Sequence, residues 1–440
     1  MTRNSSRGLQ MRLVAPVSNT GLSAVEIPPR HLKFSQLSKL QSEHSLHELV
    51  QLKSPALVPI QPSIARSLVT SLCPRGGLVY IPMSGSGTIA LEAHIAGRKI
   101  IATDPEPLFT LITQGKLSPV DIAQAAIALQ YMDFKRPIPL ERFHQGFDAF
   151  YDEDTFREIS CFRFALKEIV SGTLNGSFRF LDDSAARTAL YLSTVALGLL
   201  HGHTVGHLSS YSSPYESLAP SVQEKINRDR GALPGYRAFV PRILRKVAQL
   251  SRDCRPSQFS FNLNPGQVQC GDPRSAPHIS SGSIDLTCMQ LPLPHTGPRV
   301  QGQWLRLWLS GDILSPNRGG DINSLQEWQD WLEEVLFEVA RITRPDGYVA
   351  LLLTNSFNEK KEILPLYSIL TTILSECYAS FWEIVQTVNL NNSKTLHRHQ
   401  AKHSDNQKLP VKPAGQEESY LANRQTSEHV LVVVLRRRRS

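Results

Sequence analysis

A glycine-rich run between an apolar strand and a helix constrains this chain more than any other feature. The run is Tyr80-Ile-Pro-Met-Ser-Gly-Ser-Gly-Thr-Ile89, and Ile100-Ile-Ala-Thr-Asp104 follows it. This pattern predicts a strand, a tight turn, a helix and a second strand that ends at an acidic residue. Gly85 and Gly87 remove side chains where the backbone must approach a ligand, and the following helix offers free N–H groups. Asp104 is placed to accept hydrogen bonds from ribose hydroxyls, so the pattern favours a nucleoside site.

Composition and charge narrow the class of protein. The 440 residues suffice for one large domain or two ordinary ones. No run of about 18 apolar residues occurs and the first residues lack the apolar core of a signal peptide, so we expect no membrane span and a cytoplasmic location. The six cysteines form no CxxC pair, so we expect neither a metal site nor a disulfide framework. A net charge of +8 favours a nucleic-acid partner.

The order of elements predicts an α/β fold with one helical insertion. Strand and helix patterns alternate along most of the chain, which favours a mostly parallel sheet with helices on both faces. Between about 134 and 256 the apolar positions recur at helical spacing instead. We therefore expect an amino-terminal arm and short helix at 1–50, a first sheet portion at 51–114, a helical insertion at 115–257, and the rest of the sheet at 258–440. Within the last portion, residues 390–426 are polar and predict a mobile loop.

Two polar features of the insertion suggest ligands. A predicted helix at 235–252 carries basic residues that suit phosphate contacts on DNA, although a solvated helix face explains them equally well. The residues expected to contact DNA are Arg237, Arg242, Arg245 and Lys246. The segment His201-Gly-His-Thr-Val-Gly-His207 resembles a metal site in composition only, because its spacing lacks the helical i, i+4 pair and no Cys or acidic residue is close.

The glycine-rich run, with Gly97-Arg98 and Asp104 after it, resembles the S-adenosylmethionine signature of the DNA amino-methyltransferases. Three further segments resemble that family: Pro55–Pro62 upstream, Val268–Arg274, and Glu338–Val349. Together they cover residues about 50–110 and 265–355, and the family's Asp and second Thr are Ile81 and Ile89 here. The resemblance implies a Rossmann-like methyltransferase fold with S-adenosylmethionine as cofactor. The residues that it implies for cofactor binding are Pro59, Pro82, Ser84, Gly85, Ser86, Gly87, Thr88, Asp104 and Asp272.

The family's catalytic motif is degraded in this chain. The family has Ser/Asp-Pro-Pro-Tyr/Phe where this chain has Gln290-Leu-Pro-Leu293. The resemblance implies that Gln290, Pro292 and Leu293 occupy the catalytic positions. Gln290 keeps an acceptor oxygen, but Leu293 cannot stack on a flipped base, an interaction worth about 1–3 kcal/mol. A loss of about 3 kcal/mol corresponds to roughly two orders of magnitude in rate.

The sequence therefore predicts methyl transfer from S-adenosylmethionine to an exocyclic amine of cytosine or adenine in DNA, and a restriction enzyme is a further possible partner. Two alternatives stay open. The first is an inactive homologue that binds the cofactor or DNA in a regulatory or assembly role. The second is an RNA or small-molecule methyltransferase with the same cofactor half.

Overall fold

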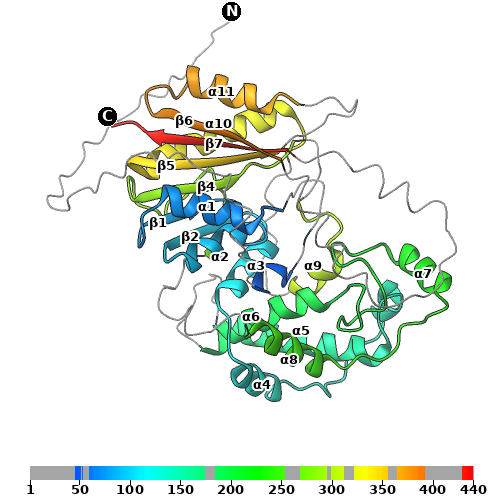
Figure 1. The fold of residues 1–440 in the computed structure, drawn as a ribbon. Coiled ribbons are helices and arrows are strands. Elements are labelled where there is room, and N and C mark those ends of the chain that lie inside the picture. The colour runs from blue at the N-terminus through cyan, green and yellow to red at the C-terminus, as the bar shows by residue number, and fades with distance from the viewer. Residues whose placement is uncertain are drawn as a thin grey trace, which may run out of the picture. The chain divides into compact units, whose positions relative to one another are not determined.

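A seven-stranded, mostly parallel sheet organises the chain in the computed structural model (Figure 1). The structure describes residues 45–50, 52, 59–173, 184–252, 268–294, 299–311, 322–354, 364–391 and 429–439. The segment expected to form a mobile loop, 390–426, lies outside the described residues except for its first two positions. The expected arm at 1–50 lies outside them up to residue 44. The strands are β1 (Leu78–Ile81), β2 (Lys99–Asp104), β3 (Val268–Cys270), β4 (Ile284–Gln290), β5 (Thr343–Thr354), β6 (Trp382–Asn391) and β7 (His429–Arg437).

The order of the described strands is β3-β2-β1-β4-β5-β7-β6, and among them only β7 runs antiparallel to its neighbours. The first five positions follow the doubly wound order, in which the direction of the chain's crossovers reverses between β1 and β4. The antiparallel strand β7 lies between β5 and β6. This position distinguishes the sheet from that of the dinucleotide-binding fold, whose strand order is 3-2-1-4-5-6. The fold is therefore α/β and Rossmann-like, as the sequence predicts. Ligands of such sheets bind beside the carboxyl ends of the strands at the reversal.

Helices cover both faces of the sheet. Alternate residues of β5 divide between two hydrophobic clusters: Ala350 and Leu352 pack with α1–α3, whereas Leu351 and Leu353 pack with α10 and α11. Figure 1 shows these two helix groups on opposite sides of the strands. The helices are η2 (Ser45–Glu48), α1 (Pro62–Leu72), α2 (Thr88–Ile95), α3 (Pro107–Leu117), α4 (Ile122–Gln130), η3 (Phe143–Phe147), α5 (Glu153–Thr173), α6 (Ser184–Leu199), α7 (Pro220–Asp229), α8 (Phe239–Leu250), α9 (Trp304–Ser310), α10 (Leu325–Ile342) and α11 (Leu366–Glu376).

Between β2 and β3 the described part of the chain has helices joined by loops, with one isolated bridge between Gly202 and Tyr211. The core of this helical block is continuous with the α1–α3 side of the sheet. Gly115 of α3 allows a close approach, because a Cβ there would lie 1.9 Å from Oγ1 of Thr194 on α6. The block is therefore packed directly against the helix that follows β2.

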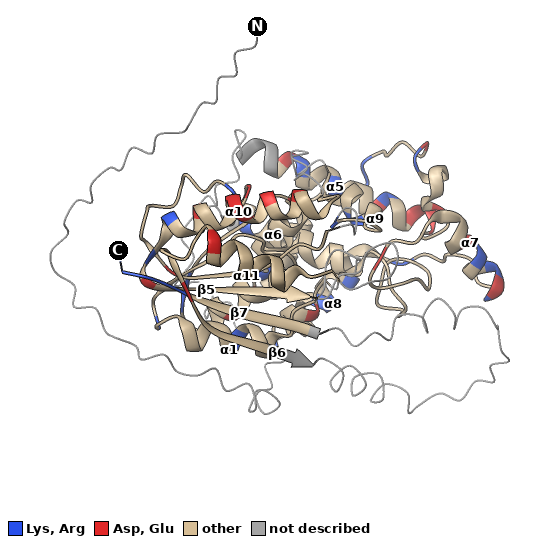
Figure 2. Cartoon of the chain, turned by 90° about the horizontal axis from the view of Figure 1, so that it is seen from above, with Lys and Arg blue, Asp and Glu red and all other residues tan. Residues whose placement is uncertain are grey.

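Helix α10 is amphipathic, with buried apolar residues on one side and acidic residues at exposed positions. Ser324 caps α10 by accepting a hydrogen bond from the Glu327 N–H, and the apolar face of α10 packs on the sheet. Figure 2 marks acidic residues in red along α10. Among the residues that the structure describes, no helix has both the length and the apolar character needed to cross a bilayer.

Candidate functional site

The glycine-rich turn joins the carboxyl end of β1 to α2. Gly85 and Gly87 have φ angles of 53° and 78°, in the left-handed region that favours glycine. A Cβ on Gly87 would lie 3.0 Å from Oγ1 of Thr113, so α3 packs directly on the turn. Gly87 is also the N-cap of α2, and no side chain caps this helix. The first N–H groups of α2 can therefore serve a polar or anionic ligand group.

The other predicted residues of the turn are held by short polar contacts. Oγ1 of Thr113 donates to Oγ of Ser84 over 3.2 Å. The hydroxyls of Ser86 and Thr88 lie 3.2 Å apart. The carbonyl of Pro82 accepts a hydrogen bond from Thr103 of β2. These contacts give the turn one defined shape, as a preformed binding loop requires.

Asp104 ends β2 with its carboxylate against the turn. The side chain is fully buried, Oδ2 accepts a hydrogen bond from the N–H of Gly85 over 2.8 Å, and Oδ1 accepts one from the N–H of Glu106 over 3.0 Å. The structure therefore brings the acidic strand end and the glycine turn together, although 19 positions separate Gly85 from Asp104 in the sequence.

Arg299 occupies the remaining side of this carboxylate. Its two terminal nitrogens lie 2.8 and 3.1 Å from Oδ1 and Oδ2 of Asp104, which is a bidentate ion pair. The guanidinium carbon lies 4.6 Å from the ring centre of Phe109 on α3, at cation–π distance. Asp104 is thus already paired at the place where the sequence predicts a ribose.

A buried lysine of α3 supports the glycine-rich turn. Lys116 of α3 is fully buried, and its ammonium donates to the carbonyls of Ser86 and His47 over 2.9 and 3.3 Å. Burial lowers the pKa of Lys116 to about 7. The side-chain nitrogen of Lys116 therefore holds the backbone of the glycine turn through hydrogen bonds to carbonyl groups.

Glu92 of α2 ties the turn's helix to the segments before β1. Its carboxylate contacts Nε2 of His47 over 2.7 Å and Nε of Arg66 on α1 over 2.6 Å. Burial lowers the pKa of His47, although the hydrogen bond with Glu92 acts in the opposite direction. A neutral His47 donates from Nε2, which agrees with a buried Nδ1 that has no hydrogen-bond partner among the described residues.

Asp272 lies just beyond β3 and pairs with Arg274. The closest contact between the two side chains is 2.6 Å, and the Asp272 side chain is 43% exposed. Burial raises the pKa of Asp272, but hydrogen bonds from Arg274 bring it below its usual value. Asp272 therefore stays ionised at the edge of the sheet, where the resemblance implies a contact with the cofactor.

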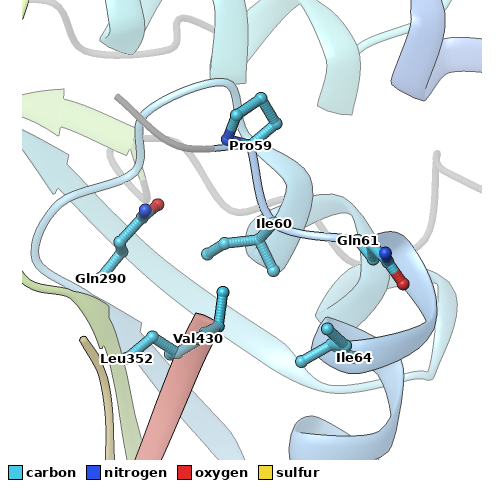
Figure 3. Close-up of a pocket in the computed structure, with 7 residues that line it drawn as sticks. All are labelled: Pro59, Ile60, Gln61, Ile64, Gln290, Leu352 and Val430. Atoms are coloured by element: carbon cyan, nitrogen blue, oxygen red, sulfur yellow. The ribbon is translucent and has the colours of Figure 1, made fainter. Parts of the chain in front are cut away.

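A small pocket joins two predicted site residues from distant parts of the chain. Pro59 and Gln290 line it with Ile60, Gln61, Ile64, Leu352 and Val430, and Gln290 faces Pro59 and Ile60 across it (Figure 3). Its volume is about 10 Å³, close to the least that one water needs. The strand end that carries Gln290 thus lies beside Pro59, which the resemblance implies for cofactor binding.

The rest of the predicted catalytic motif packs inward. Leu291 and Leu293 are buried, at 3% and 8% exposure, in the cluster that contains Trp328. The indole N–H of Trp328 donates to the carbonyl of Pro292 over 2.8 Å. The side chain at the family's aromatic position therefore contributes to the α10 face of the core.

The predicted DNA-binding residues gather at one side of α8. Arg237 precedes the helix and donates to the carbonyl of His207, while Arg242 donates to that of Ala238. Burial lowers the pKa of Arg242, and the neighbouring Arg245 lowers it further. Burial likewise lowers the pKa of Lys246. Within the described part of the chain, no carboxylate forms an ion pair with any of these side chains, so the patch keeps its positive charge.

The histidine-rich segment makes internal hydrogen bonds. His201 contacts the carbonyl of Ser213 over 2.7 Å and the hydroxyl of Ser217 over 3.2 Å. Nδ1 of His207 lies 2.8 Å from Oγ1 of Thr204. No group of three or more His, Cys, Asp or Glu able to hold a metal occurs among the described residues. His201 and His207 therefore have hydrogen-bond partners within the same part of the chain, which explains them as structural residues.

Known proteins offer few similarities to this chain. No protein-family model matches the sequence, and no curated protein matches it. Two solved structures of the rRNA methyltransferase aviRa from Streptomyces viridochromogenes are similar to it. The first is 11% identical, with 92% of this chain and 94% of that chain covered and a TM-score of 0.27. The second is 10% identical, with 90% and 93% covered and the same TM-score. Because a TM-score of 0.27 is too low to support an inference, the fold assignment rests on the strand order.

Sequence reasoning missed Arg299 and Lys116 near the turn. Arg299 lies 195 positions from Asp104, and no local pattern marks it as the partner of that carboxylate. Lys116 carries little local signal, because Thr113, Gln114 and Gly115 precede it, and only the structure shows that this end of α3 is buried. A lone lysine among buried positions is unusual and points to a specific task for its ammonium.

Proposed function

We propose that this chain is an S-adenosylmethionine-dependent methyltransferase that acts on an exocyclic amine of cytosine or adenine in DNA. The observation that carries the proposal is the hydrogen bond between the Gly85 N–H and the Asp104 carboxylate, at the carboxyl ends of β1 and β2. A glycine turn, an uncapped helix start and a buried acid meet there, beside the reversal of the strand order, where such sheets bind ligands.

The residues of the turn fit the cofactor once Arg299 has left Asp104. Asp104 would then accept hydrogen bonds from the ribose, Asp272 would lie near the adenine, and Ser84–Thr88 with Pro59 and Pro82 would border the methionine portion. S-adenosylmethionine supplies an activated methyl group. The protein's own task is to position the acceptor amine and to stabilise the positive charge that develops on it.

Gln290 is the side chain best placed for that task. It ends β4 in the pocket with Pro59, and its amide oxygen can accept a hydrogen bond from the amine. Pro292 and Leu293 would hold the following loop on α10, with Trp328 fixing the carbonyl of Pro292. In this proposal the base is positioned by hydrogen bonds, without an aromatic ring from Leu293.

The protein should transfer tritium from labelled S-adenosylmethionine to DNA. We expect Gln290→Ala to lower the rate roughly tenfold to a hundredfold, because a hydrogen bond to a charged group contributes about 1.5–3 kcal/mol. Gln326→Ala is the matched control, since Gln326 is exposed on α10 and donates from its side chain to Asp330 of the same helix. Equal rates for wild type and Gln290→Ala would refute the assigned role of Gln290.

One observation favours a second function. Leu293 is buried in the core, and Gln290 replaces the family's acidic or hydroxyl group. An inactive homologue that binds the cofactor or DNA in a regulatory role would have this pattern. Cofactor binding without transfer to DNA, RNA or small amines would establish it, whereas transfer to RNA alone would favour an RNA methyltransferase.

The basic side of α8 is the proposed DNA contact. We expect Arg245→Ala/Lys246→Ala to weaken binding to all DNA sequences alike. The slope of log K against log salt should fall by about 1 for each phosphate that the variant no longer neutralises. Arg75→Ala/Lys99→Ala removes the same charge from exposed positions at the amino ends of β1 and β2 and serves as control. Identical salt slopes for the two double variants would contradict the placement of DNA on α8.

A further inference from the structure

Arg299 contacts the candidate cofactor site directly, and the proposed function requires its departure without giving it a role. Its guanidinium forms the bidentate pair with Asp104 at 2.8 and 3.1 Å and lies over Phe109 at 4.6 Å. The Arg299 side chain is 13% exposed and that of Asp104 is 0% exposed. Bidentate geometry strengthens an ion pair, and burial shields it from solvent, so this pair is stronger than an exposed surface ion pair.

The pair leaves the carboxylate no capacity for another ligand. A carboxylate has about four lone-pair sites. Two accept the N–H groups of Gly85 and Glu106, and two accept the nitrogens of Arg299. The backbone donors belong to the turn itself and stay with it. A ribose hydroxyl can therefore reach Asp104 only in place of Arg299.

Arg299 also belongs to the part of the chain that follows β4, the strand that ends at Gln290. After β4, the carbonyl of Pro292 accepts a hydrogen bond from Trp328 of α10. Arg299, farther along the chain, pairs with Asp104 on the cofactor side of the site. The chain that follows the Gln290–Leu293 motif is consequently held, through Arg299, to Asp104, the carboxylate proposed to bind the ribose. Release of Arg299 from Asp104 would therefore affect both the cofactor side and the base side of the site.

We propose that Arg299 competes directly with the cofactor's ribose for Asp104, so that cofactor binding and release of Arg299 are one event. This inference rests on the proposed function. The observed dissociation constant then equals the intrinsic one divided by the fraction of molecules in which Arg299 has left Asp104. Because the bidentate pair keeps that fraction small, Arg299 determines the apparent affinity for a nucleoside cofactor.

Titration calorimetry of S-adenosylmethionine with the full chain tests this competition. We expect Arg299→Ala to bind about tenfold more tightly than wild type or better, since that change requires an open fraction of about one tenth or less in wild type. Arg299→Lys should lie between them, because lysine keeps the charge but cannot form the bidentate pair. Thermal unfolding of each variant verifies that it is folded, and Arg299→Gln replaces Arg299→Ala if the latter is not.

Arg136→Ala is the matched control. Arg136 also pairs with a carboxylate, Glu168 at 2.7 Å, and lies 4.9 Å from the ring centre of Phe164, but it is far from the turn in the helical block. Its affinity should equal that of wild type. Equal binding by wild type and Arg299→Ala would overturn the competition and leave the cofactor assignment standing. Absence of binding by both folded proteins would overturn the competition and the proposed cofactor together.

Discussion

Replacing Asp104 with alanine should abolish binding of S-adenosylmethionine and lower the free energy of unfolding by about 3–5 kcal/mol, the usual effect of removing one partner of a buried ion pair. The variant leaves the guanidinium of Arg299 without its carboxylate and deprives the N–H groups of Gly85 and Glu106 of their acceptor. The glycine turn and the ion pair fail together, because one side chain serves both. Urea unfolding and titration calorimetry measure the two effects.

Asp272→Ala controls for the stability effect. Asp272 also follows a strand end and pairs with an arginine, but both side chains are more than 40% exposed. Exposed pairs contribute about 0–1 kcal/mol, so Asp272→Ala should unfold almost like wild type. Full affinity for the cofactor in Asp104→Ala would contradict the placement of the ribose. A loss of stability no larger than that of Asp272→Ala would contradict the importance of the buried pair.

Lys116→Met should remove a pH dependence of stability between about pH 7 and 10.5. In the folded protein burial lowers the pKa of Lys116 to about 7 from its usual value of 10.5. Between these values the unfolded chain holds the proton and the folded chain does not, so unfolding takes up a proton and raising the pH stabilises the fold. The penalty for burying the ammonium is thus full below pH 7 and disappears as the pH approaches 10.5.

The measurement compares urea unfolding of wild type and Lys116→Met across this range. Relative to the variant, wild type should gain up to about 1.4 kcal/mol for each pH unit, the value of one proton. Methionine matches the length of lysine but leaves the carbonyls of Ser86 and His47 without this donor. Lys135→Met, at an exposed position, controls for the loss of one lysine from the chain. Parallel stability curves for wild type and Lys116→Met would refute the prediction.

Local patterns made much of the sheet predictable. The apolar periodicity of residues 324–343 predicts a helix, which is observed as Leu325–Ile342, and the apolar run Val430–Leu435 predicts a strand, which lies within β7. Pro105 and Pro107 predict the end of a strand, but the local pattern does not predict α3. Pro107 begins this helix, where a missing N–H costs nothing. As a result the support that α3 gives the glycine turn through Thr113 and Lys116 was missed.

The sequence by itself determined the fold class and the glycine turn, because glycines, apolar periodicity and a strand-ending acid act over short separations that a pattern can show. Only the tertiary structure decided what Asp104 contacts. Arg299, 195 positions away, takes the carboxylate that the pattern assigned to a ribose. The structure also directs Leu293 into the core beside Trp328 and brings Pro59 next to Gln290. Such pairings depend on how strands and helices pack, and the energy of a buried charge then selects the partner that reaches it.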